Sequence, residues 1–218
     1  GQTCIVPDYL FVHKKIKREF IELLKESIIS TFGKDASKSE NYGRIINQKQ
    51  FLRLSNLLSQ GEILFGGETI ESENYISPTL IRPYELGDSL MQEEIFGPVL
   101  PVISFENFDD VINDLKTKDK PLALYIFSSN KRNINRAATE LSYGGGCIND
   151  VIIHLATCHM GFGGIGESGM GSYHGKDGFA AFSHYKSVMD KKTWLDLPMR
   201  YQPYKNKLYE MLLHMFLK

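Results

Sequence analysis

Short apolar runs and amphipathic stretches alternate along the second half of the chain. The runs over 99–104 and 122–127, and another that begins at Gly145, are nearly continuous in apolar residues, which is typical of buried strands. Between them, apolar residues recur every three or four positions, which predicts two amphipathic helices. Their apolar faces carry Phe108, Val111, Ile112 and Leu115, and then Ile134, Ala137, Ala138 and Leu141. This alternation predicts an α/β fold, in which a mostly parallel sheet has helices on both faces.

The first half of the chain is predicted to contain the same kinds of element. Apolar residues repeat at helical spacing from Ile16 to Ile28, and Gly33 is a suitable residue to end that helix. Asn47 is a suitable cap for a second helix. The remaining predicted elements are a strand over 4–12, the second helix over 48–60, and short strands over 62–65 and 75–81.

The C-terminal third has a different character. Seven glycines lie between residues 161 and 175, which indicates a loop; no strand-then-helix frame surrounds them, so this is not a dinucleotide fingerprint. Strand character returns over 183–189, and an apolar-rich helix is predicted over 203–218. We therefore expect one α/β domain over 1–182, followed over 183–218 by an oligomerisation strand, which would pair across a dimer interface near residues 183–189, and a tail helix.

Composition narrows the class of protein. The 218 residues are 42% hydrophobic with a net charge of −1, which is typical of a globular protein and gives no field that would recruit nucleic acid. The three cysteines Cys4, Cys147 and Cys158 have no metal-binding spacing, which argues against a disulfide framework and favours a reducing compartment such as the cytoplasm. No apolar run is long enough to span a bilayer.

The stretch from Gln92 to Val99 carries the strongest candidate chemistry. In extended backbone Glu94 and Phe96 would point to the same face. There the carboxylate can accept hydrogen bonds from a ribose diol, and the ring can pack against a flat heterocycle. Gly97 would permit close backbone approach at this point. The alternative is a turn with one solvated glutamate and one core phenylalanine.

Two motifs carry a resemblance to a known family. Gly1-Gln2-Thr3-Cys4 and Glu94-Ile95-Phe96-Gly97-Pro98 resemble the aldehyde dehydrogenases, and residues 42–46, 121–130 and 169–176 are similar to their class 3 branch. The resemblance implies that Cys4 is the nucleophile and that Glu94 and Phe96 hold the nicotinamide ribose of NAD or NADP. On spacing alone, Cys4 would be read as a small core residue.

The resemblance also implies a substrate site. Residues 149–154 correspond to the strand and loop beside the family's substrate funnel, so Ile152, Leu155 and Ala156 would line an apolar entrance; ordinary core packing is the alternative. Class 3 enzymes act on medium- and long-chain aliphatic and aromatic aldehydes, generally as homodimers.

Gly161 stands where the family commonly has proline, which makes the glycine-rich loop over 161–175 less constrained. His154 and His174 are interpreted as hydrogen-bonded structural residues, and no metal site is predicted.

The family's cofactor domain, its water-activating glutamate and its oxyanion-hole asparagine lie upstream of the cysteine. We therefore expect this chain to be a C-terminal piece that is inactive alone. Two rivals stay open: an enzyme that transfers the acyl group to coenzyme A, and a truncated dimerisation module without catalysis. The tail helix could lie on a membrane surface, cover the substrate entrance, or pack on its own domain.

Overall fold

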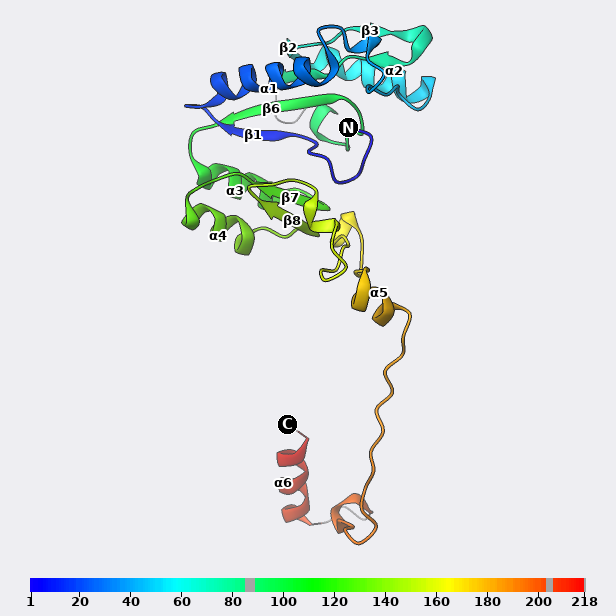
Figure 1. Ribbon diagram of the computed structural model, residues 1–218. Helices are drawn as coiled ribbons and strands as arrows, with labels where there is room; N and C mark the ends of the chain where they lie inside the picture. Colours follow the sequence, from blue (N-terminus) through cyan, green and yellow to red (C-terminus); the bar gives the residue numbers. More distant parts are fainter. Residues whose placement is uncertain (85–88, 203–205, 218) are drawn as a thin grey trace. The chain divides into compact units, whose positions relative to one another are not determined.

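The computed structural model describes residues 1–84, 89–202 and 206–217 (Figure 1). The chain divides into two compact units, Gly1–Phe182 and Ser183–Lys218. The first unit holds the strands and most of the helices of the described chain. The assignment of Gly1–Phe182 as a catalytic domain stays a prediction.

The main sheet of the first unit has the order β1-β6-β5-β2. β1 (Leu10–His13) and β5 (Thr79–Pro83) each pair in parallel with the central β6 (Val99–Phe105). β2 (Gly61–Phe65) pairs antiparallel with β5 at the edge. The prediction of a mostly parallel sheet is confirmed, with one antiparallel edge strand that the sequence pattern did not reveal.

Helices cover both faces of this sheet. Adjacent residues of β5 point to opposite faces, so Leu80 packs with α1 (Lys17–Phe32) and Ile81 packs with α2 (Gln48–Leu57). Figure 1 shows α1 lying along β6 and β1. The core under α1 is formed by Val12, Ile21, Leu80 and Val102, and the core under α2 by Ile45, Phe51, Leu54, Leu57, Ile76, Ile81, Leu90, Ile95 and Val99.

The ends of both helices follow the predicted signals. Gly33 has a φ of +82°, and its N–H donates to the Ile29 carbonyl oxygen at 2.8 Å, which ends α1. The Asn47 side chain accepts from the Gln50 N–H at 3.0 Å and caps α2. The last turn of the predicted second helix, Leu58–Gln60, is a 3₁₀ helix.

A second sheet consists of two parallel strands, β7 (Ala123–Ile126) and β8 (Gly145–Ile148). A helix precedes each of these strands in the chain: α3 (Phe108–Thr117) precedes β7, and α4 (Lys131–Glu140) precedes β8. The strand predicted over 122–127 is present as β7, but it is half-buried where a buried strand was expected, and Phe127 after it is 67% exposed. Burial of a strand depends on the layers that pack on its two faces, which an apolar run alone does not specify.

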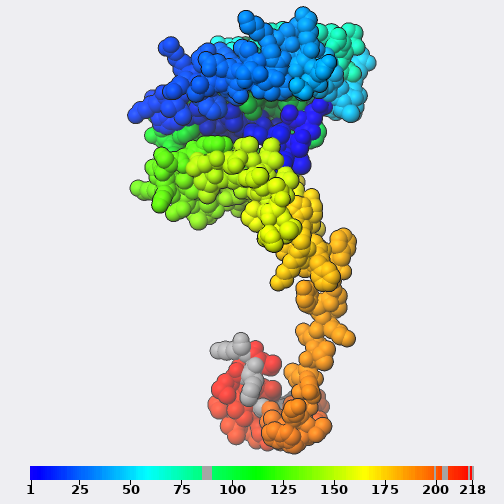
Figure 2. Space-filling model, viewed as in Figure 1, coloured from blue at the N-terminus to red at the C-terminus, as the bar shows by residue number. Residues whose placement is uncertain are grey.

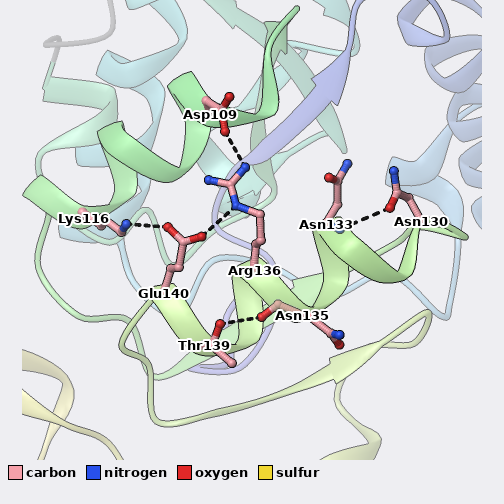
Figure 3. Close-up of polar contacts among 8 residues, drawn as sticks. All are labelled: Asp109, Lys116, Asn130, Asn133, Asn135, Arg136, Thr139 and Glu140. Atoms are coloured by element: carbon pink, nitrogen blue, oxygen red, sulfur yellow. Dashed lines mark hydrogen bonds and ion pairs between the residues drawn. The ribbon is translucent and has the colours of Figure 1, made fainter.

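Charged side chains join α3 to α4 (Figure 3). Arg136 forms ion pairs with Asp109 on α3 and, from Nε at 2.7 Å, with Glu140 on its own helix. Glu140 also accepts from Lys116 Nζ at 2.6 Å. Glu140 therefore bridges cations from both helices, and its pKa falls to about 2 because Arg136 and then Lys116 hydrogen-bond its carboxylate.

Two predicted strands differ from the structure. Residues 3–6 form a turn and bend, so the strand predicted over 4–12 begins only at Leu10. Residues 183–189 adopt no regular structure, because a strand needs a neighbour for its backbone groups and no described strand pairs with them. The glycine-rich loop over 161–175 is confirmed as mostly irregular, with a bridge between Phe162 and Tyr173.

The smaller elements complete the first unit. β3 and β4 form a short antiparallel hairpin, and α5 follows the glycine-rich loop. Their bounds are Thr69–Ile70 for β3, Tyr75–Ile76 for β4 and Gly175–Ala181 for α5, with 3₁₀ turns at Ala36–Lys38, Glu71–Glu73, Ser89–Met91, Ile153–Leu155 and Gly166–Ser168.

The second unit contains a 3₁₀ turn, Pro198–Arg200, and the helix α6, Lys207–Phe216. The predicted tail helix is thus present from Lys207, while residues 203–205 and 218 of the prediction lie outside the described residues. The Asn206 side chain caps α6 by accepting from the Leu208 N–H at 2.9 Å. Among the described residues, none of the helices has the length and apolar character that a bilayer crossing requires.

Candidate active site

Cys4 lies in a turn that precedes β1. The Val6 N–H donates to the Thr3 carbonyl oxygen at 3.2 Å, which closes the turn. The thiol of Cys4 is exposed and free, whereas the neighbouring Ile5 side chain is buried. Because Ile5 anchors the turn, the sulfur is accessible to a small-molecule electrophile without the turn being loose.

Side chains from within and outside the turn hold it in place. Gln2 donates from Nε2 to the Arg44 carbonyl oxygen at 3.0 Å, and its Oε1 accepts from the Ile46 N–H at 3.2 Å. The Tyr125 hydroxyl, on β7, donates to the Ile5 carbonyl oxygen at 2.6 Å. The backbone on either side of Cys4 is therefore fixed to two separate segments of the first unit.

A second loop, residues 92–98, carries Glu94 and Phe96 just before β6. Both side chains are exposed, and the Phe96 ring is 42% accessible. Ile95 between them is only 1% exposed and packs in the core beneath α2. Burial of Ile95 anchors the loop, so the carboxylate and the ring on either side are presented to solvent.

The backbone of this loop differs from the predicted extended conformation. Phe96 has a φ of +52°, in the left-handed region that residues other than glycine rarely adopt. The prediction that strand alternation places Glu94 and Phe96 on one face is therefore wrong, since that periodicity holds only in extended backbone. The chain turns here because Gly97 passes directly over α2: a Cβ on Gly97 would lie 2.6 Å from Leu54 Cδ atoms. The predicted close approach at Gly97 is confirmed.

The N-terminal segment contacts this loop directly. Asp8, four residues after Cys4, accepts from the Ile95 N–H at 2.9 Å. On the other side of Ile95, its carbonyl oxygen accepts from Arg53 Nη2 at 2.5 Å. The structure thus brings the segment that carries Cys4 into contact with the loop that carries Glu94.

Two carboxylates near this contact are partly desolvated. Burial raises the pKa of Asp8, an effect that the Ile95 N–H and the Arg53 charge oppose. Burial also raises the pKa of Glu94, and the nearby charge of Asp8 adds to this rise. A carboxylate with reduced hydration is a good acceptor for hydroxyl donors such as those of a ribose diol. The structure therefore presents a carboxylate and an aromatic ring to solvent in the same loop, and their cofactor role stays a prediction.

The predicted substrate residues follow β8. Ile152 is 37% exposed with a φ of +68°, Leu155 is half-buried, and Ala156 is exposed. Ile152 lies close enough to Tyr125 for its backbone N–H to oppose the rise that burial causes in the pKa of Tyr125, whose hydroxyl donates to the Ile5 carbonyl oxygen. Figures 1 and 2 show the blue N-terminal segment beside the yellow-green segment that follows β8. The structure therefore places these partly exposed apolar side chains in a segment near Tyr125, whose hydroxyl bonds to the Cys4 turn.

The histidines and the other cysteines have other surroundings. His154 is buried with Nδ1 at 3.5 Å from Cys147 Sγ, and burial lowers its pKa. The prediction of a hydrogen-bonded His154 is met at Nδ1 only, because its buried Nε2 has no hydrogen-bond partner among the described residues. His174 stacks on Phe162, and its buried Nδ1 also has no partner there, which differs from the prediction. Cys158 is exposed. Over the described residues, no group of three or more potential metal ligands occurs.

Asp8 and Tyr125 are site residues that the sequence interpretation missed. Each carried a signal: Asp8 is the one charged residue within 4–12, and Tyr125 interrupts the apolar run over 122–127 with a hydroxyl. A polar group within an apolar run needs a hydrogen-bond partner when it is buried. The signal indicates that a partner exists but does not identify it.

The sequence and the structure both match known proteins. The model for the aldehyde dehydrogenase family matches residues 1–188. Aldehyde dehydrogenase family 3 member B1 of Homo sapiens is 40% identical over 98% of this chain and 46% of its own length. The dimeric NADP-preferring aldehyde dehydrogenase of Mus musculus is 43% identical over 87% of this chain and 42% of its own length.

A solved structure of AldH from Staphylococcus aureus in a substrate-bound state superposes with a TM-score of 0.88 at 42% identity. It covers 100% of this chain, which in turn covers 48% of that protein. The chain therefore spans less than half the length of each of these relatives.

Proposed function

Because the chain belongs to the aldehyde dehydrogenase family, we propose that it supplies the nucleophile and part of the cofactor site of an enzyme that oxidises aldehydes to carboxylic acids. In this proposal Cys4 is the nucleophile, and Glu94 and Phe96 contact the nicotinamide ribose of NAD or NADP. The observation that carries the proposal is the 2.9 Å hydrogen bond from Ile95 to Asp8, which joins the Cys4 segment to the Glu94–Phe96 loop.

The chemistry at Cys4 follows from its accessible sulfur. The thiolate attacks the carbonyl carbon of the aldehyde and forms a thiohemiacetal. The Cys4 backbone N–H makes no hydrogen bond to another described residue, so it is available to donate to the oxygen that becomes negatively charged. The bound cofactor supplies the hydride acceptor. Loss of hydride leaves an acyl thioester on Cys4, and attack by water releases the carboxylic acid and restores the thiol.

Glu94 and Phe96 act by positioning. The Glu94 carboxylate would accept hydrogen bonds from the ribose hydroxyls of a bound cofactor, and the exposed Phe96 ring would pack against its nucleotide. NAD and NADP are both compatible with these contacts, because the proposed contacts are with the nicotinamide nucleotide, which the two cofactors share. One relative, the mouse enzyme, is NADP-preferring, which supports a place for NADP among the cofactors of this enzyme.

The substrate class in the proposal is medium- and long-chain aliphatic aldehydes together with aromatic aldehydes. It is supported by the apolar and partly exposed Ile152, Leu155 and Ala156, which offer an apolar tail or ring a surface on which to pack. The Tyr125 hydroxyl donates to the Ile5 carbonyl oxygen and lies near the backbone of Ile152, so this surface is in the same part of the unit as the Cys4 turn.

We further propose a cytoplasmic homodimer whose tail contacts a membrane surface. The mouse relative is dimeric, which supports the dimer. The proposed dimer would supply residues 183–189 with the strand neighbour that they lack in the described chain. The exposed Leu208 and Met211 of α6 support the membrane contact, since apolar side chains on a surface helix can enter the headgroup region.

The activity is tested in the complete natural polypeptide that contains this chain. Cys4→Ala should abolish NAD(P)-dependent oxidation of an aldehyde such as dodecanal, whereas Cys158→Ala should leave it unchanged. Cys158 is a matched control because its thiol is also exposed and free. Activity that survives Cys4→Ala would contradict the proposal.

The same assay separates the rival functions. Release of the carboxylic acid in the absence of coenzyme A supports the proposed hydrolysis. Product that forms only when coenzyme A is present would indicate an acyl-transferring enzyme. A folded wild-type polypeptide that does not react with aldehyde would favour a dimerisation module without catalysis.

A further inference from the structure

Ile95 lies between the two proposed cofactor residues, Glu94 and Phe96. Both its backbone N–H and its carbonyl oxygen hydrogen-bond to charged side chains. We propose that Asp8 and Arg53 are positioning residues that fix the Glu94–Phe96 loop and couple it to the Cys4 segment. This inference rests on the proposed function and adds two residues to it. Neither residue belongs to the motifs that indicated the site.

The contact has the geometry of a clamp around Ile95. Asp8 Oδ1 accepts from the Ile95 N–H at 2.9 Å, and Arg53 Nη2 donates to the Ile95 carbonyl oxygen at 2.5 Å. The two side chains come from different elements, the segment before β1 and the helix α2. Hydrogen bonds to ionised groups are stronger than those between neutral groups, so the position of Ile95 is set by both elements.

The two charged groups are themselves held in place. Arg53 Nε donates to Gln50 Oε1 at 2.7 Å, which orients the guanidinium from within α2. The Arg53 charge also stabilises the ionised form of the half-buried Asp8. Asp8 therefore stays available as an acceptor even though burial opposes its charge.

The clamp lies next to a backbone conformation that needs support. Phe96 has a φ of +52°, and such conformations persist in residues other than glycine only when the surroundings fix them. Gly97 restrains the loop on one side by its contact with Leu54, and the clamp on Ile95 restrains it on the other. Without the clamp, Phe96 is free to return to a negative φ, which would move its ring and the Glu94 carboxylate together.

A purely structural role would have a different signature. If Asp8 and Arg53 only stabilised the fold, their removal would lower stability without a selective effect on the cofactor. As positioning residues, they act on the Michaelis constant for NAD(P) and on hydride transfer. They should leave the intrinsic reactivity of the Cys4 thiol unchanged, because neither side chain bonds to the Cys4 turn in the hydrogen bonds of the described residues.

The test uses Asp8→Ala, Asp8→Asn and Arg53→Met in the complete natural polypeptide. Asp119→Ala and Arg132→Met are matched controls, since both residues are exposed. Asp8→Ala and Arg53→Met should each raise the Michaelis constant for NAD(P) and slow single-turnover hydride transfer by roughly tenfold or more. Asp8→Asn keeps an acceptor oxygen and should fall between these variants and the wild type. The rate at which iodoacetamide alkylates Cys4 should not change in any of them.

Hydrogen exchange gives a second readout that does not depend on activity. The Ile95 amide should exchange slowly in the wild type and in Asp8→Asn, and rapidly in Asp8→Ala. If Asp8→Ala fails to fold, Asp8→Asn and Arg53→Met decide the kinetic question.

The outcomes separate the two proposals. Folded variants with unchanged cofactor kinetics and an unchanged Ile95 exchange rate would overturn the clamp while leaving the proposed function intact. A folded wild type that neither binds nor reduces NAD(P)+ would overturn the proposed function and the clamp with it.

Discussion

At the scale of single residues, a few side chains fix the turn that presents the free thiol of Cys4. The turn around it is fixed by Gln2, by the buried Ile5 and by the hydroxyl of Tyr125. The motif around Cys4 is what allowed a role to be proposed for it from the sequence. Tyr125 was not predictable in the same way, because its hydrogen bond to Ile5 joins residues 120 positions apart.

Removal of the Tyr125 hydroxyl should therefore affect catalysis more than folding. In Tyr125→Phe the Ile5 carbonyl loses its donor, and the Cys4 turn loses its anchor on β7. We expect the turnover number in the complete enzyme to fall by roughly tenfold. Tyr143→Phe is the control, since its hydroxyl makes no hydrogen bond in the described chain. Equal turnover in both variants would argue against the anchor.

Gly97 is a residue whose side-chain size matters. In Gly97→Ala the new Cβ would lie 2.6 Å from Leu54 Cδ atoms, so the loop or the helix must shift. We expect the free energy of unfolding to fall by about 1 to 3 kcal/mol. Gly43→Ala is the matched control, because a Cβ there meets no atom within 4 Å. Urea denaturation of both variants measures the difference, and equal stabilities would contradict the close approach.

At the scale of elements, the helices were the most predictable part of the fold. Their apolar spacing and their end signals, Gly33 for α1 and Asn47 for α2, depend on neighbours within a few residues. Strands depend on distant partners, which explains why the run over 4–12 became a turn and a short β1. The left-handed φ of Phe96 also depends on a distant contact, the passage of Gly97 over Leu54.

The inner face of α2 supplies the support on which the Glu94–Phe96 loop rests. Leu54 is fully buried and contacts Gly97, whereas Leu52 on the same helix is 47% exposed. Leu54→Ala should lower the free energy of unfolding by about 2 to 5 kcal/mol, because it leaves a cavity in the core. Leu52→Ala should have a much smaller effect in the same urea titration. Similar losses in the two variants would show that the face of α2 is wrongly assigned.

The ion pairs between α3 and α4 predict a dependence on pH (Figure 3). The pKa of Glu140 falls from 4.5 to about 2 on folding, because Arg136 and Lys116 stabilise its charged form. Its contribution to stability is therefore present above about pH 4.5 and is lost as the pH falls towards 2. Glu140→Gln should show a smaller loss of unfolding free energy than the wild type between pH 5 and pH 3. Glu26→Gln, an exposed control on α1, should lose as much stability as the wild type.

At the scale of the whole molecule, the chain matches less than half of each relative that we compared. The family could be predicted because two motifs and three further stretches resemble it, and the fold class because apolar runs alternate with amphipathic stretches. The substrate and the oligomer could not be derived from residue patterns, since both depend on surfaces that form between segments. Residues 183–189 illustrate this: their strand character is readable, but no described strand pairs with them.

The central claim is that Cys4 carries the acyl group during turnover. The most direct test is to quench the complete enzyme with acid while it oxidises hexanal and to analyse its cysteine-containing peptides by mass spectrometry. We predict a hexanoyl adduct on the peptide that contains Cys4, and none on the peptides that contain Cys147 and Cys158. An adduct on either of those cysteines, or steady product formation with no adduct on Cys4 in any rapidly quenched sample, would contradict the account.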